Sequence, residues 1–236
     1  MSASSALAIR LPPLDANLPQ PLSFQTSLYY EPAKRNHGHA HDPLLAIVAP
    51  RPIGWISTLS AAGLVNLAPY SYFNIFSLRP AIVGFSSNGH KDTLTNVEET
   101  GEFVCNLAVE SLVQQVNLTS AELARGSSEM DYAKLESASS RLVRPPRVAA
   151  VPCALECKWT ETVHLKDHRG QPSQNFLALG EVVGVYIDDN FVVDGRLDIT
   201  KLHTLARCGY MDYTWVEAVF HVPRPGTPEE PADVVL

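Results

Sequence analysis

Several features that define large functional classes are missing from this chain. Its four cysteines include no Cys-x-x-Cys pair, and its first residues lack the basic stretch followed by a long apolar run that makes a signal peptide. No uncharged apolar run approaches the roughly 20 residues that a membrane-spanning helix needs. These absences predict a soluble cytoplasmic protein with free thiols and no membrane partner.

Positive charge is also scarce. Eighteen basic residues face 25 acidic ones, for a net charge of -7. This balance argues against a broad surface for nucleic acid or an anionic membrane, because such surfaces need many lysines and arginines. Any anion-binding site in this protein is therefore expected to be local.

The 236 residues, 45% of them apolar, are enough for one large domain with a full core. Residues 1–43 carry six prolines, and four more follow after position 222. Proline at this density blocks helix and strand hydrogen bonds. We therefore interpret 1–43 as an N-terminal arm, 44–221 as the folded domain and 222–236 as a C-terminal arm. No internal repeat is present.

Strand-like runs dominate the domain. They cover residues 44–49, 53–60, 64–70, 81–87 and 102–108, followed by an alternating run near 155–165 and a fully apolar run at 176–187. Residues 60–63 have the length of a hairpin loop with glycine in the left-handed position. Short helices are expected at 93–100, after an Asp92 N-cap, at 109–116 and at 200–206. This pattern favours an antiparallel barrel with helices at its rim.

The segment His90-Lys91-Asp92-Thr93 follows a strand and starts a helix. The first amides of a helix have no partner within it and attract phosphate, and Lys91 and Thr93 add a charge and a hydroxyl donor. Ser86 and Ser87 precede this point. The alternative interpretation is an ordinary helix start with a solvated lysine.

Two further segments carry possible binding groups. In residues 50–58, prolines flank Arg51, whose guanidinium could reach an anion or a partner subunit, and Trp55 is either a core residue or a cofactor wall. In residues 66–74, the chain is expected to leave its strand at Pro69, so that the following amides could bind a heterocycle. The alternative for that segment is a strand end with aromatic core residues.

Together these segments resemble the flavin reductase-like family of FMN-binding split β-barrel proteins. The resemblance rests on PRPIGWIST, NLAPYSYFN, KDTLTN and GEFVCNLA, and more loosely on PRVAAVPCALEC, LGEVVGVYIDD, DGRLD and LARCGYMDY. It implies a mainly β fold, a six-stranded antiparallel Greek-key split barrel with short flanking helices. It also implies a homodimer that binds FMN near its interface and accepts hydride from NADH or NADPH.

The resemblance also implies positions for the cofactor. Lys91, Asp92, Thr93, Ser86 and Ser87 would lie near its phosphate and ribityl chain. One side of the ring system would be lined by Arg51, Ile53, Trp55, Ser57 and Thr58, and its polar edge would be met by Asn66, Ala68, Tyr70 and Ser71. Many relatives resemble Arg-x-Gly-Gly where this chain has Arg207-Cys208-Gly209-Tyr210. Because of this departure, Arg207 and Tyr213 are ranked below the other residues as members of the pocket.

No catalytic side chain is assigned, because hydride transfer to flavin needs stacking rather than a protein nucleophile. The chain has no Gly-x-Gly-x-x-Gly, so the nicotinamide is expected to lie directly over the flavin. The function predicted is an NAD(P)H-dependent flavin reductase that could supply a partner monooxygenase. The alternatives are a non-enzymatic FMN electron carrier of the flavoredoxin type and a barrel without flavin that serves as a binding module.

Two other groups of residues have competing interpretations. His37, His39 and His41 could hold zinc or copper if extended, but they lie in a segment flanked by proline and glycine, and we favour a mobile arm with only adventitious metal affinity and no metal site. Cys153 and Cys157 would point to one face of a strand about 13 Å apart, too far to form a disulfide, and are expected to be buried.

Overall fold

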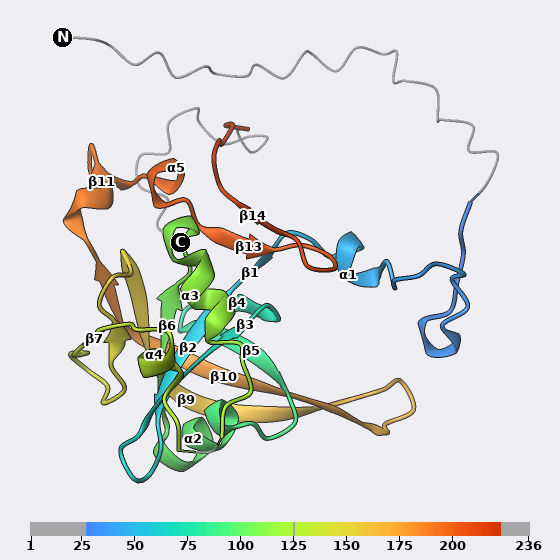
Figure 1. The fold of residues 1–236 in the computed structure, drawn as a ribbon, viewed down its shortest axis with the longest axis horizontal. Coiled ribbons are helices and arrows are strands. Elements are labelled where there is room, and N and C mark those ends of the chain that lie inside the picture. Colours follow the sequence, from blue (N-terminus) through green and yellow to red (C-terminus); the bar gives the residue numbers. More distant parts are fainter. Residues whose placement is uncertain (1–26, 125, 223–236) are drawn as a thin grey trace.

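The computed structural model describes residues 27–124 and 126–222. In this part of the chain, strands outnumber helices, and the largest sheet has seven antiparallel strands (Figure 1). The prediction of a mainly β, antiparallel fold is confirmed, with seven strands in the sheet instead of six. Of the predicted arms at 1–43 and 222–236, residues 1–26 and 223–236 lie outside the described residues.

The seven strands follow a Greek-key order. After the β2–β3 hairpin the chain crosses to the other edge of the sheet for β4 and β5, and then returns to β6 beside β2. The long β9–β10 hairpin fills the middle. In sheet order the strands are β3 (Val65–Tyr70), β2 (Gly54–Leu59), β6 (Glu102–Leu107), β9 (Cys153–Lys166), β10 (Pro172–Ile187), β5 (Ala81–Asn88) and β4 (Phe73–Leu78).

Short elements surround this sheet. Among the described residues the helices are α1 (Leu44–Ile47), α2 (Asp92–Thr100), α3 (Val113–Leu118), α4 (Glu129–Tyr132) and α5 (Ile199–Leu202), with 3-10 turns at Pro32–Lys34, Glu110–Leu112 and Asp189–Phe191. The small sheets are β1 (Arg51–Pro52) with β13 (Leu205–Arg207) and β14 (Tyr213–Trp215), β7 (Ser137–Ala138) with β8 (Arg147–Val148), and β11 (Val192–Val193) with β12 (Arg196–Leu197).

Strand β2 is buried on both faces and separates two apolar clusters. Trp55 packs into one cluster with Leu67 and Val104, while the next residue, Ile56, packs into the other. This alternation follows from the period of two of a strand. The second cluster includes Leu94 of α2, so the helix is held against the sheet by apolar burial.

Residues 44–49 do not form the predicted strand. Leu44–Ile47 make the helical turn α1, and the Arg51 guanidinium donates to the carbonyl oxygens of Leu45 and Val48, each at 2.7 Å. An apolar run between prolines is ambiguous between strand and helix, and here a cation that binds carbonyls favours the helix. The sequence alone does not show where that guanidinium points.

The strand predicted to end at Pro69 continues to Tyr70. Pro69 lies opposite Trp55 in the β2–β3 ladder, and β3 is at an edge of the sheet, where proline is tolerated. Strand β4 immediately follows and was not predicted. Asp92 is the first residue of α2, and Lys91 is the N-cap. The helix predicted at 200–206 ends at Leu202, and Leu205 begins β13.

The alternation predicted along β9 breaks at a register shift. Trp159 lies opposite Gly180 but Glu161 lies opposite Leu179, so one residue is inserted and the faces exchange. Val163 is exposed as a result, and Glu156, predicted to face water, is 7% exposed. Its carboxylate accepts hydrogen bonds from the amides of residues 141 and 142, at 2.8 and 2.6 Å.

Other predictions about the fold are confirmed. Gly63 takes a left-handed φ of 81° in the β2–β3 loop, and Gly101 closes α2 with a φ of 73°. Cys153 and Cys157 are buried free thiols. No helix in the described ranges is long and apolar enough to cross a membrane.

Gly180 of β10 lies against an aromatic ring of the core. A Cβ at this position would be 2.4 Å from Phe103, whereas at Gly184 on the same strand the nearest atom would be 3.2 Å away. We expect Gly180→Ala to lower the free energy of unfolding by about 1–3 kcal/mol, because the core must shift to admit the methyl group. Urea denaturation measures this change. Gly184→Ala is the control, and an equal loss in both variants would contradict the packing argument.

Candidate functional site

A cleft of about 430 Å³ opens between β3, the end of β5 and the start of α2, and we call it the β3–α2 cleft. It is lined on one side by the edge strand and on the other by the loop after α3 and the first residue of α4. The lining residues are Asn66, Ala68, Pro69, Tyr70, Ser71, Tyr72, Ser86, Asn88, Lys91, Asp92, Thr93, Thr119, Ser120, Ala121, Glu122, Leu123, Glu129 and Asn175.

A buried polar network forms the floor of the cleft. The Asn66 amide donates to the Thr93 hydroxyl at 2.8 Å, which joins β3 to the first turn of α2. The Tyr70 hydroxyl is hydrogen-bonded with Thr93 and Ser87. Burial raises the pKa of Tyr70 above its usual value, and the two hydrogen bonds act in the opposite direction. Tyr70 is therefore a neutral hydrogen-bonding group at neutral pH.

The start of α2 presents donors to the cleft. Lys91, the N-cap, has an extended backbone and its side chain makes no capping hydrogen bond to the helix. Its ammonium group lies 3.4 Å from Glu122, and both side chains are largely exposed. A first turn without a side-chain cap retains amides that can bind an anion, and the helix dipole favours negative charge there.

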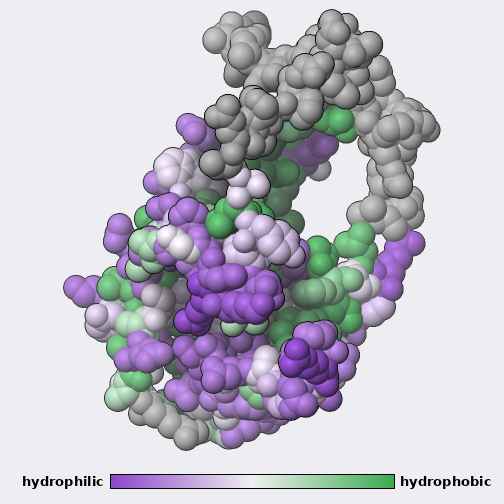
Figure 2. All heavy atoms as spheres, turned by 90° about the vertical axis from the view of Figure 1, so that its right-hand side faces the viewer, coloured by the Kyte–Doolittle hydropathy of each residue, from purple (hydrophilic) through white to green (hydrophobic). Residues whose placement is uncertain are grey.

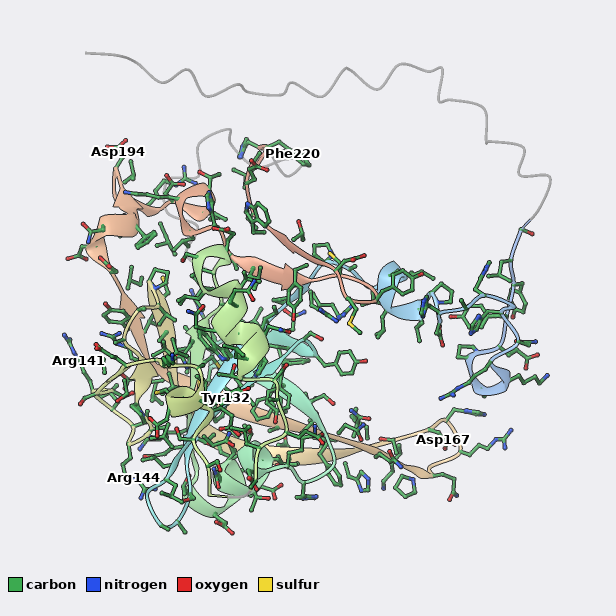
Figure 3. All side chains as sticks on the ribbon, viewed as in Figure 1. Tyr132, Arg141, Arg144, Asp167, Asp194 and Phe220 are labelled. Atoms are coloured by element: carbon green, nitrogen blue, oxygen red, sulfur yellow. The ribbon has the colours of Figure 1, made fainter. Side chains whose placement is uncertain are left out.

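The carboxyl group of Glu129 lies in the same cleft, at the start of α4. One of its oxygens accepts from the Leu67 amide at 3.2 Å. Burial raises the pKa of this carboxyl, and the charge of Asp92 raises it further, while two backbone amides, its own and that of Leu67, lower it. Figure 3 labels Tyr132 at the other end of α4, near the centre of the view.

The cleft contains eight of the fourteen residues predicted to bind a cofactor. They come from two of the three predicted segments and are Asn66, Ala68, Tyr70, Ser71, Ser86, Lys91, Asp92 and Thr93. The remaining six lie elsewhere, or behind the wall of the cleft.

Four of those six are fully buried. Trp55 is 0% exposed and its indole donates to Thr119, a residue of the cleft wall, at 2.9 Å. Ser57 donates to the Pro146 carbonyl at 2.6 Å, and Thr58 accepts from Asn96 at 3.0 Å. Ser87, also 0% exposed, donates to the Gly89 carbonyl at 2.8 Å. In this structure their polar groups form hydrogen bonds within the protein interior.

Arg51 is also directed inward. Besides the two carbonyls of α1, its guanidinium donates to the Cys208 carbonyl at 2.9 Å. The residue is 8% exposed, and its Nε has no hydrogen-bond acceptor among the described residues. Its contacts are thus those of a structural cation that ties the chain before β1 to the turn after β13.

Part of the cleft could not be predicted from the sequence. Glu129 and residues 119–123 belong to no recognisable motif, and Asn175 reaches the cleft only because β10 pairs with β5. Asn175 donates to Ser86 at 3.3 Å. Only the three-dimensional pairing brings these residues to the segments that the sequence identified.

Comparison with known proteins gives the family. The family model described as "Flavin reductase like domain" matches residues 48–198, which is more than half of the chain. The chain belongs to the flavin reductase-like family.

Three related proteins support this assignment. An uncharacterized protein of Halalkalibacterium halodurans is 34% identical over 187 residues, which cover 77% of this chain and 89% of that protein. The crystal structure of nitrilotriacetate monooxygenase component B from Bacillus cereus is 28% identical, with a TM-score of 0.76, over 84% of this chain and 99% of that one. The 2-nitrobenzoate 2-nitroreductase of Pseudomonas fluorescens is 25% identical, with a TM-score of 0.69, over 80% and 91%. The predicted split-barrel fold is confirmed.

This flavin reductase-like chain has Gly209-Tyr210 in place of the two glycines of the Arg-x-Gly-Gly pattern, and the replacement changes the backbone locally. Gly209 lies against α1, where a Cβ would be 2.6 Å from Ala46. Tyr210 takes a φ of 57°, which costs a tyrosine more than a glycine. Gly209 therefore keeps the close approach to α1, whereas Tyr210 introduces backbone strain.

A second cavity of about 570 Å³ adjoins the β3–α2 cleft, with which it shares Pro69, Ser71 and Ser120. It brings together Ile53, Arg207 and Tyr213 with residues of α3. The Arg207 guanidinium lies 4.4 Å from the centre of the Tyr213 ring and donates to the carbonyls of Tyr210 and Met211. Ile53 thus lies near the predicted site but outside the cleft itself.

The segment with three histidines shows ring contacts. The rings of His37 and His39 are stacked 6.2 Å apart, and the His41 ring lies 5.6 Å from that of Tyr210. No group of three or more His, Cys, Asp or Glu side chains in the described part of the chain is placed to hold a metal ion.

A structural role for Arg51 can be tested by removing its charge. We expect Arg51→Met to lower the free energy of unfolding by about 2–3 kcal/mol, because three partly buried carbonyl groups lose a charged hydrogen-bond donor. Thermal and urea unfolding measure the loss. Arg141→Met is the control, since Arg141 is an exposed residue at the periphery in Figure 3. An equal stability in both variants would contradict the role.

Proposed function

We propose that this protein binds FMN in the β3–α2 cleft and passes hydride from NADH or NADPH to the flavin. The observation that carries the proposal is the convergence of two of the three predicted segments, residues 66–71 and 86–93, on one cleft. Its volume of about 430 Å³ lies within the range of about 300–1,000 Å³ for small-molecule sites. The cytoplasm is the compartment we propose, since the four cysteines are free thiols.

The polar end of the cleft fits a phosphate. The first turn of α2 offers backbone amides and a positive dipole, Lys91 offers a charge, and Ser86 offers a hydroxyl. Asp92, Glu122 and Glu129 also line the cleft and oppose this attraction. The phosphate must therefore be held by direct hydrogen bonds rather than by a broad positive field.

The other end fits a flat ring. Pro69, Tyr70 and Tyr72 give it apolar surface, and the exposed Tyr72 also lies within 6.0 Å of the Arg51 guanidinium. The residues of this end position a ring and exclude water from one of its faces. Bound FMN supplies the hydride-accepting chemistry, which requires no nucleophile from the protein.

A homodimer is part of the proposal. Ile75, Phe76 and Leu78 of β4 are each more than half exposed, as are Ile47 and Val48 beside α1. Edge strands with exposed apolar residues favour association with another chain. Figure 2 shows apolar and polar residues gathered in separate areas on one face of the molecule. Analytical ultracentrifugation that finds only monomers at micromolar concentration would contradict this part.

The proposed activity is tested by mixing the purified protein with FMN and either NADH or NADPH. We expect consumption of the reductant faster than in a control with flavin alone. A monooxygenase is the acceptor that we propose to test first, because the similar Bacillus cereus protein is a monooxygenase component. No reductant consumption above the control would overturn the enzyme proposal.

An FMN electron carrier remains the second candidate, and the same cleft supports it. A carrier needs only to hold the flavin, and no residue of the cleft distinguishes the two functions. A bound flavin that neither nicotinamide reduces, but that a reduced partner protein does, would favour the carrier. A protein that binds no flavin would leave only the binding module.

Lys91→Ala tests the phosphate end of the cleft. We expect FMN affinity to fall by about 1.5 kcal/mol, roughly tenfold, the lower limit for a charged hydrogen bond, because the lysine is half exposed. Quenching of flavin fluorescence measures the dissociation constant. Lys34→Ala is the control, since Lys34 also pairs with a glutamate but lies in an N-terminal 3-10 turn. Equal affinity in the two variants would mean that Lys91 does not contact the phosphate.

A further inference from the structure

The acidic side chain of Glu129 occupies an unusual position for a cleft that binds an anion. It is half buried, it lines the cleft with Lys91 and Asp92, and one oxygen is held by the Leu67 amide at 3.2 Å. That hydrogen bond fixes the carboxyl group at the edge strand and keeps it from swinging out to solvent. A ligand that fills the polar end of the cleft therefore meets this group.

Among the residues that the structure describes, the charges around Glu129 do not neutralise it. Asp92, at the start of α2, acts on it as a like charge. Lys91 is 3.4 Å from Glu122, on the opposite side of the cleft mouth. Tyr70 and Tyr72 are the other titratable side chains that line the cleft. No cation among the described residues is recorded in a salt bridge with Glu129.

We propose that Glu129 makes the binding of phosphorylated flavin depend on pH: the protonated carboxyl group admits the phosphate, and the ionised group repels it. This inference rests on the proposed function, because it concerns the same cleft. Binding takes up a proton from solvent only between the pKa of the free carboxyl group and its higher pKa in the complex. Apart from the O–H bond that this proton makes, only hydrogen bonds form or break.

Two physical arguments support the direction of the effect. Burial raises the pKa of the Glu129 carboxyl, so the protonated form persists to a higher pH than in an exposed glutamate. A bound phosphate would raise that pKa again, since a second negative charge disfavours ionisation. A carboxyl with a raised pKa is ionised as pH rises, so affinity falls with rising pH.

The test uses Glu129→Gln, which keeps an oxygen for the Leu67 amide and removes the charge. FMN and riboflavin are the probes, and fluorescence quenching gives their dissociation constants at about pH 5.5 and about pH 8. The phosphate of FMN itself titrates near pH 6, so wild type and variant are compared at the same pH. At the lower pH we expect the smaller difference in FMN affinity between the two proteins, because more of the Glu129 carboxyl is protonated there.

At the higher pH we expect the variant to bind FMN about tenfold more tightly than wild type, the ratio that one unit of pKa coupling gives. Riboflavin, which lacks the phosphate, is expected to bind both proteins equally at each pH. Asp131→Asn is the control, because Asp131 is an exposed acid on the same helix and does not line the cleft. It is expected to behave as wild type.

Each other outcome overturns the inference. An FMN affinity ratio between variant and wild type that is the same at both pH values means that Glu129 does not act on the phosphate, while the proposed function stands. An equal gain for riboflavin means that it acts on the ring or the ribityl chain. Failure of wild type to bind either flavin removes the inference and the proposed function together.

A further measurement needs no variant. In wild type, the ratio of the dissociation constants of riboflavin and riboflavin 5'-sulfate reports the contribution of an anionic group whose single charge does not titrate in this pH range. We expect this ratio to fall by about tenfold between about pH 5.5 and about pH 8. A constant or rising ratio overturns the inference even if Glu129→Gln fails to fold.

Discussion

The cleft depends on two buried side-chain hydrogen bonds that fix α2 against the edge of the sheet. Asn66 of β3 donates to Thr93, and Asn96 donates to Thr58 of β2. Neither pair is exposed to water, so a broken bond would leave a buried polar group without a partner, at a cost of about 1–3 kcal/mol. These bonds, with the apolar contacts of Leu94 and Val97, place the first turn of the helix beside β3. Without that placement the residues of the two segments would not share a site.

The fold and half of the site follow from local sequence. The alternation at β2, the glycine of the β2–β3 loop and the glycine that ends α2 are each local signals, and each predicts the observed element. The motif order predicts that residues 66–71 and 86–93 meet in one site. Alternation with a period of two shows which residues share a face of a strand, but it does not show which face borders a cavity. Trp55 and Ser57 were therefore predicted to line the site, whereas both are buried in the interior.

Other predictions failed where a contact outside the segment decided the local structure. Residues 44–47 have a composition that suits a strand, but they form a helical turn whose carbonyls bind the guanidinium of Arg51. Glu156 fills a wet position in the alternating pattern, but it is buried and its carboxylate accepts from the amides at 141 and 142. Glu129 joins the cleft through the packing of α4 on β3, which no motif records. In each case the partner lies outside the segment whose pattern was interpreted.

The three carbonyls that bind Arg51 also define how much of the chain forms a folding unit. The region that matches the family model, residues 48–198, contains Arg51 and the Val48 carbonyl but excludes Leu45 and Cys208. A fragment cut to those limits would carry a desolvated cation stripped of two of its three acceptors, and β1 would lose β13, its neighbour in the sheet. The segment that the family model matches is thus shorter than the smallest piece of this polypeptide that can satisfy its own interior, and expression boundaries belong outside α1 and β14.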